Sequence, residues 1–243
     1  MSERNQGMFI TVEGTDGAGK TTVLECIGEE LEQHIRDGRS PVLTREPGGT
    51  VFGELLRASI LTHRGADKPS ATTELLCMLA SRVHHLEHNI LPALAHDRVV
   101  VCSRFNDTTR VLQGVLGEKG ELIQNLSKLN EFKFLRHRPD ITIFIDVDDE
   151  VAAARLKTQG DDDCLGEKWQ QFSRLSQTWR QHMRLAELHP SVAHGPSKII
   201  RINGNQTKQE VAGECLDKLS RAMVCFHERS PMQQSFFEKM CGL

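Results

Sequence analysis

The sequence predicts an α/β fold: a five-stranded parallel sheet with helices on both faces. Two observations support this prediction. Short runs rich in Val and Ile recur along the 243 residues and are almost continuously apolar, as are strands covered on both faces. Segments with helical periodicity separate these runs, and such alternation favours a parallel sheet that binds ligands at the carboxyl ends of its strands.

Each expected strand is a short apolar run. The first is Met8-Phe-Ile-Thr-Val12, and later examples are Arg-Val-Val-Val-Cys at 98–102 and Ile-Thr-Ile-Phe-Ile-Asp-Val at 141–147. We therefore expect strands at 8–13, 41–45, 98–102, 141–147 and 198–202.

The expected helices lie between these strands and after the last one. Their apolar residues recur at helical spacing. We expect helices at 19–37, 52–62, 71–95, 121–135, 149–158, 167–188 and 207–226. The polar segment 159–167, which is flanked by glycines, separates two of them and is typical of a mobile surface loop. We therefore expect one domain over residues 1–226 and a C-terminal extension over residues 227–243.

Composition excludes several classes of protein. A net charge of -3 and a pI near 6.4 disfavour a protein that coats nucleic acid. The seven cysteines form no C-x-x-C pair, so neither a zinc ribbon nor a dithiol redox site is indicated. No segment is typical of a signal peptide or a membrane span. We therefore expect a cytoplasmic protein with neither a membrane nor a nucleic acid as its partner.

The first expected strand leads into a complete G-x-x-x-x-G-K-T motif and then a helix. In this context the motif predicts a loop whose backbone N–H groups and following helix N-terminus bind nucleotide phosphates. Lys20 is expected at the β- and γ-phosphates, and the Thr21 hydroxyl on Mg²⁺. The predicted nucleotide-binding residues of this loop are Gly14, Thr15, Asp16, Gly17, Ala18, Gly19, Lys20, Thr21 and Thr22.

Two further segments accompany this motif. Thr-Arg-Glu-Pro-Gly-Gly-Thr at 44–50 ends the second expected strand, and Arg-Pro-Asp-Ile-Thr-Ile-Phe-Ile-Asp-Val at 138–147 contains the fourth. Together with Val-Glu-Gly-Thr-Asp-Gly-Ala-Gly-Lys-Thr-Thr at 12–22, they resemble the thymidylate kinase family. Residues 72–95 resemble that family's long helix. The similarity runs from about residue 8 to 222.

This resemblance implies ATP-dependent phosphorylation of dTMP to dTDP, with Mg²⁺. It implies that Arg45 and Arg104 hold the acceptor phosphate, which suits guanidinium groups because they bond phosphate bidentately. Asp16 would lie by the acceptor's 3′-hydroxyl, and Arg82 at the base edge. The resemblance also implies a lid at about 155–168 that includes Arg155, and a homodimer formed through helices near 71–95 and 105–115. The remaining residues expected around the acceptor are Met78, Phe105, Leu112 and Gln113.

The chain departs from the family pattern in several places. Ser103 replaces a carboxylate that helps hold Mg²⁺, Met78 replaces an aromatic that stacks on thymine, and Leu112 replaces a tyrosine near C2′. The arginines that family members place in the lid or inside the phosphate loop are absent, which leaves Arg155, Lys157 or Lys168 for that role. Two alternatives therefore stay open: a kinase for another or modified pyrimidine nucleotide, free or in DNA, and a nucleotide-binding relative with little kinase activity.

Another pattern has a simpler interpretation than a functional one. His84, Glu87 and His88 lie within about one helical turn, a spacing that can bind a metal ion. No second cluster of ligands accompanies them, so a solvated helix face or contact with the acceptor site is favoured.

Overall fold

The computed structural model describes residues 7–34, 40–63, 67–129, 134, 136–158, 169–188 and 198–227. The extension predicted over 227–243 therefore lies, apart from His227, outside the described residues. All five predicted strands are present within one or two residues of the expected bounds. They are β1 (Met8–Glu13), β2 (Val42–Arg45), β3 (Val99–Ser103), β4 (Ile141–Asp146) and β5 (Lys198–Asn203).

The strands form one parallel sheet in the order β2-β3-β1-β4-β5, which confirms the predicted fold class. β1 lies at the centre, between β3 and β4. Its register places Val12 beside Ser103 of β3 and beside Ile143 of β4. The phosphate-loop motif therefore leaves the middle of the sheet at its carboxyl edge, where a parallel sheet of this kind binds ligands.

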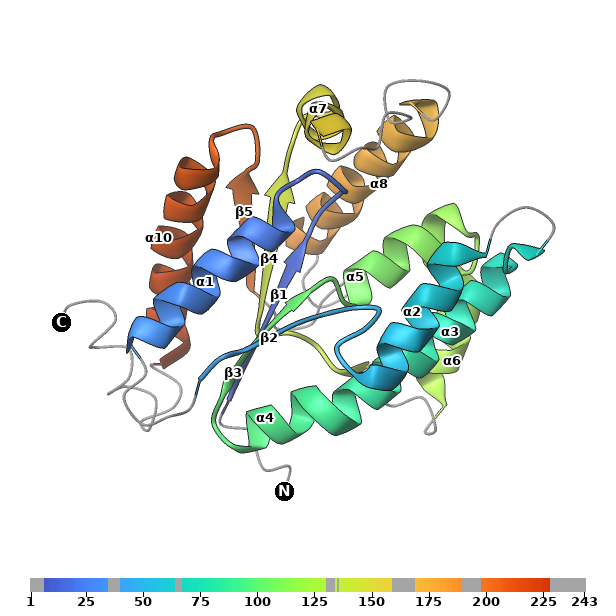
Figure 1. The fold of residues 1–243 in the computed structure, drawn as a ribbon, viewed down its shortest axis with the longest axis horizontal. Coiled ribbons are helices and arrows are strands. Elements are labelled where there is room, and N and C mark those ends of the chain that lie inside the picture. The colour runs from blue at the N-terminus through green and yellow to red at the C-terminus, as the bar shows by residue number, and fades with distance from the viewer. Residues whose placement is uncertain are drawn as a thin grey trace.

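Helices cover both faces of the sheet (Figure 1). On one face, alternate residues of the strands pack with α1 (Lys20–His34), α7 (Asp149–Thr158) and α10 (Lys208–His227) in the largest apolar core. On the other face, Phe9 and Val100 pack under the π-helical segment η2 (Leu86–Ile90) and α4 (Leu91–Ala95). Phe144 of β4 contacts Trp179 and Met183 of α8 (Trp169–Leu188).

The helices match the sequence prediction except in two places. The helix expected at 121–135 is α6 (Gly120–Lys128), which ends where Leu129 turns extended. The periodicity also missed α5 (Asn106–Thr109) and the π-helical segment η3 (Arg110–Leu116) that continues it. The remaining helices are α2 (Val51–Thr62) and α3 (Ala71–His85). None of the described helices has the length and apolar character that crossing a bilayer requires.

Candidate functional site

The phosphate-loop motif connects β1 to α1, as its spacing predicts. Gly17 adopts φ +75°, and a Cβ there would collide with the Ala152 carbonyl oxygen, so both conformation and space require glycine. The Lys20 ammonium donates to the carbonyls of Gly14 (3.1 Å) and Thr15 (2.7 Å) across the loop. The loop is therefore closed by the lysine expected to bind phosphate.

An aspartate of the loop lies between two cations. Asp16 Oδ1 lies 2.5 Å from an Arg104 guanidinium nitrogen and 3.6 Å from Lys20 Nζ. Burial raises the pKa of Asp16, but the charges of Arg104 and Lys20 outweigh it and lower that pKa to about 2. Burial, and then the charge of Arg104, lowers the pKa of Lys20 to about 7. This pair of cations is thus arranged to meet an anion.

A cleft of about 540 Å³ opens beside the loop at the carboxyl edge of the sheet. It brings together residues that lie far apart in the sequence. Ten of the residues predicted from the sequence line it: Asp16, Gly17, Ala18, Gly19, Lys20, Thr21, Thr22, Arg45, Arg104 and Arg155, and Ser103 lines it as well. Its size and its arginines suit a ligand with several phosphate groups.

Besides Arg155, three arginines line this cleft, at the end of β2, on α2 and just after β3. Arg45 ends β2 and pairs with Glu54 of α2 at 2.9 Å. Arg104 follows β3 with φ 70°, a left-handed backbone that is uncommon for a residue other than glycine. Sequence analysis missed the third, Arg57 of α2, which donates to the Pro47 carbonyl at 3.1 Å. Burial, and then the charge of Arg45, lowers the pKa of Arg57.

A signal for Arg57 was present in the sequence. The turn at 44–50 ends at Thr50, whose side chain caps α2 by accepting from the Gly53 N–H. Side chains on a helix tilt toward its N-terminus, so Arg57 in the second turn of α2 can reach back to the turn at 44–50. Gln206 and Lys208 also line the cleft and were not predicted.

Arg82 lies outside this cleft, in a buried polar network. Its three guanidinium nitrogens donate to the side chains of Glu46, Asn106 and Thr109 at 2.6, 3.0 and 2.9 Å. Only 3% of Arg82 is exposed, and its guanidinium lies 4.7 Å from the ring centroid of Phe105, which is itself buried. Arg82 lines a second pocket of about 280 Å³ with Thr109 and Arg138.

The other residues expected around the acceptor base occupy different environments. Met78 is half-buried on α3, one helical turn before Arg82. Leu112 packs on the apolar cluster that contains Trp179. Gln113 is buried and donates to Glu74 at 2.6 Å. Neither the cleft nor the second pocket brings all of these residues together.

The predicted lid lies mostly outside the described residues, which stop at Thr158 and resume at Trp169. Lys168 lies in that gap. Arg155 is described: its guanidinium donates to the carbonyls of Gly17 (3.5 Å) and Gln206 (3.0 Å). Arg155 therefore joins the phosphate loop to the segment before α10.

A buried carboxylate links the phosphate loop to α5. Glu13, just before the loop, accepts from the Phe105 N–H and from the Thr108 hydroxyl, both at 2.7 Å. Thr108 in turn accepts from Arg104 at 3.2 Å. Burial, and then the nearby charge of Asp107, raises the pKa of Glu13 to about 7.

Within the described residues, no group of three His, Cys, Asp or Glu side chains is placed to hold a metal ion. The rings of His84 and His88 lie against each other with centroids 4.2 Å apart and planes tilted by 40°. At the cleft the hydroxyls of Thr21 and Ser103 are available. Magnesium retains several waters and binds through few protein oxygens plus substrate phosphates. These two hydroxyls therefore fit a Mg²⁺ ion that arrives with a nucleotide.

Comparisons with known proteins agree on one family. The family model for thymidylate kinase matches residues 12–212. The thymidylate kinase of Acinetobacter baylyi is 37% identical over 213 residues, which is 87% of this chain and 98% of that protein. That of Latilactobacillus sakei is 34% identical and covers 91% of this chain and 99% of its own. The crystal structure of thymidylate kinase from Ehrlichia chaffeensis matches with TM-score 0.57 and 28% identity, over 88% of this chain and 98% of that one.

Proposed function

The chain belongs to the thymidylate kinase family, and we propose that it transfers the γ-phosphoryl group of ATP to dTMP, with Mg²⁺. A phosphate oxygen of dTMP forms a bond to the γ-phosphorus, the bond from that phosphorus to ADP breaks, and dTDP forms. The observation that carries this proposal is that four cations, Lys20, Arg45, Arg57 and Arg104, line the same cleft. The triphosphate of ATP and the phosphate of dTMP repel each other, and such a set of cations offsets the repulsion.

On the donor side, the phosphate loop would bind ATP. Lys20 would exchange its bonds to loop carbonyls for the β- and γ-phosphates. Thr21, with Ser103 nearby, would hold Mg²⁺, which when bound neutralises charge on the phosphates. Arg155 packs against the loop, which supports a role beside the donor nucleotide.

On the acceptor side, Arg45, Arg57 and Arg104 would hold the phosphate of dTMP. Asp16 accepts a hydrogen bond from Arg104 and would accept one from the 3′-hydroxyl of the sugar when dTMP is bound. Arg82, with Met78 one turn away, would contact the base. The buried network around Arg82 fixes the direction of its guanidinium, so this contact would select the base by geometry.

Exposed apolar residues on neighbouring helices support a homodimer. Val51 (84% exposed) and Leu55 lie on α2, Leu76 lies on α3, and Val115 lies in η3. These last two fall in the segments expected to pair, at 71–95 and 105–115, and exposed apolar side chains there suit an association site. Leu76→Glu should convert the dimer to a monomer in light scattering. The four described cysteines that are free support a reducing cytoplasmic setting.

The test is product detection by mass spectrometry after incubation with Mg-ATP and a panel of nucleoside monophosphates. The panel contains dTMP, dUMP, 5-hydroxymethyl-dUMP, dCMP, dGMP, dAMP and UMP. dTDP should form faster than any other product. A dominant product other than dTDP would overturn the acceptor assignment and identify the base that the pocket prefers. Absence of every diphosphate, with ATP still bound, would overturn the kinase activity itself.

A further inference from the structure

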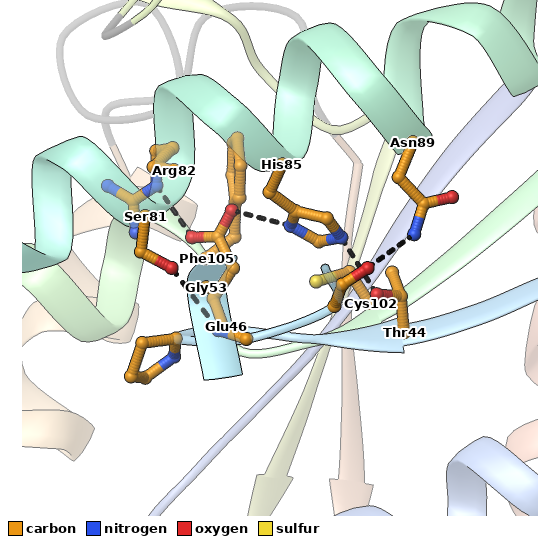
Figure 2. Close-up of polar contacts among 12 residues, drawn as sticks. Thr44, Glu46, Gly53, Ser81, Arg82, His85, Asn89, Cys102 and Phe105 are labelled. Carbon is orange, nitrogen blue, oxygen red and sulfur yellow. Dashed lines mark hydrogen bonds and ion pairs between the residues drawn. The ribbon is translucent and has the colours of Figure 1, made fainter. Parts of the chain in front are cut away.

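A stripe of polar side chains on α3 and η2 forms hydrogen bonds with the turn that follows β2 (Figure 2). Ser81 accepts from the Gly48 N–H at 3.3 Å, and Asn89 donates to the Gly49 carbonyl at 3.0 Å. Between these two residues along the helix, Arg82 and His85 both form hydrogen bonds with Glu46. The stripe consists of Ser81, Arg82, His85 and Asn89.

His85 forms the centre of this stripe and is fully buried. Its Nδ1 lies 3.1 Å from one oxygen of Glu46, and its Nε2 lies 2.7 Å from the Thr44 hydroxyl. The other oxygen of Glu46 accepts from Arg82. An ionised carboxylate only accepts hydrogen bonds, so Nδ1 carries the proton in this contact. Removal of the imidazole would leave two buried oxygens without this partner, which is costly.

The two residues that His85 contacts flank Arg45. Successive side chains alternate in direction along an extended segment, so Thr44 and Glu46 point toward α3 while Arg45 points to the cleft. His85 therefore holds the backbone on both sides of the arginine assigned to the acceptor phosphate. A Cβ on Gly49 would collide with the imidazole and with the Thr44 hydroxyl, so the turn packs directly on the ring.

We propose that His85 is a positioning residue for the acceptor: it sets Arg45 for the phosphate and, through Glu46, sets Arg82 for the base. This inference rests on the proposed function, because that function assigns both arginines to dTMP. His85 itself does not touch the substrate. Loss of His85 should therefore weaken the binding of dTMP and leave the binding of ATP almost unchanged, since His85 contacts neither Lys20 nor the phosphate loop.

The experiment compares KM for dTMP, KM for ATP and kcat in His85→Leu, His85→Asn and the wild type. His85→Leu removes both hydrogen bonds and should raise KM for dTMP about tenfold, as expected for one lost buried bond to a charged group. His85→Asn retains a donor near Nδ1 for Glu46 and should recover part of this loss. KM for ATP should change less than about twofold, because His85 makes no contact with Lys20 or the phosphate loop. A twofold change corresponds to about 0.4 kcal/mol. Glu87→Gln, exposed on the same helical segment, is the matched control.

A double-mutant cycle separates positioning from general packing. If His85 acts through Arg45, His85→Asn should add almost nothing to KM for dTMP in an Arg45→Ala background. Multiplicative effects, or equal rises in both KM values, would overturn the proposal. If His85→Leu fails to fold, His85→Asn and Thr44→Val answer the same question. Wild-type protein that neither binds nor phosphorylates dTMP would instead overturn the proposed function, and this inference with it.

Discussion

The donor and acceptor halves of the cleft are built in opposite ways. Most of the donor half comes from eight consecutive residues, Gly14–Thr21, with Ser103 and Arg155 added from elsewhere, and Lys20 bonds to carbonyls only five and six residues away. The acceptor half takes Arg45, Arg57 and Arg104 from β2, α2 and the end of β3. The donor half is mostly local to one turn, whereas the acceptor half needs the sheet and helix α3 in place. Specificity for the acceptor is therefore the part of the site most sensitive to distant packing.

Removal of the donor lysine should have the largest effect. Lys20→Ala should lower kcat for dTDP formation on the order of 10²–10³-fold, because a preorganised charge facing the transferred phosphoryl group is lost. Initial rates at saturating dTMP measure this. Lys198→Ala, an exposed lysine on β5, should retain wild-type rates. A comparable loss in both variants would contradict the donor role.

The arginine that sequence analysis missed should give the next largest effect. Arg57→Ala should raise KM for dTMP roughly tenfold, the expected result of losing one charge-assisted bond to phosphate. Steady-state kinetics with each substrate varied in turn measure this. An equal rise in KM for ATP would contradict this prediction, because it would place Arg57 in the donor half as well.

Glu13 joins the two halves, and its ionisation should appear in stability. Its pKa is raised from 4.5 to about 7, so between these values the native protein binds more protons than the unfolded chain. The free energy of unfolding should therefore fall as pH rises from 4.5 to about 7, by at most about 1.4 kcal/mol per pH unit.

Urea unfolding of wild type and Glu13→Gln across that pH range tests this expectation. Glutamine can accept from the Phe105 N–H and donate to the Thr108 hydroxyl, so the variant should fold with a flatter profile. Identical slopes in the two proteins would show that another group titrates in this window.

The smallest effect concerns the base. Met78→Phe should lower KM for dTMP by about two- to tenfold, because aromatic stacking contributes roughly 0.5–1.5 kcal/mol beyond buried area. It should also widen the preference for dTMP over dCMP, measured by competition. An unchanged KM would place the half-buried Met78 side chain away from the base.

The sequence predicted the sheet and the donor half because both depend on local patterns. Apolar strands and an eight-residue motif carry their own signals. Periodicity alone missed the segment Asn106–Leu116, in which a four-residue helix runs into the π-helical η3, whereas the family resemblance implied a helix near 105–115. The buried bonds of Arg82 to Glu46, Asn106 and Thr109 join segments up to 36 residues apart, which no local pattern reveals.

The tight packing of the phosphate loop also has an evolutionary consequence. Some family members carry an arginine inside this loop, whereas here Gly17 abuts the Ala152 carbonyl and Ala18 is fully buried in the main core. An arginine at position 17 would be harmful until α7 had shifted to admit it, and one at position 18 would bury its charge in the core. That route to a new catalytic cation therefore has a fixed order, in which neutral changes around Ala152 come first. In a lineage with this loop, a catalytic cation is more easily supplied by Arg155 or by a substitution in the predicted lid.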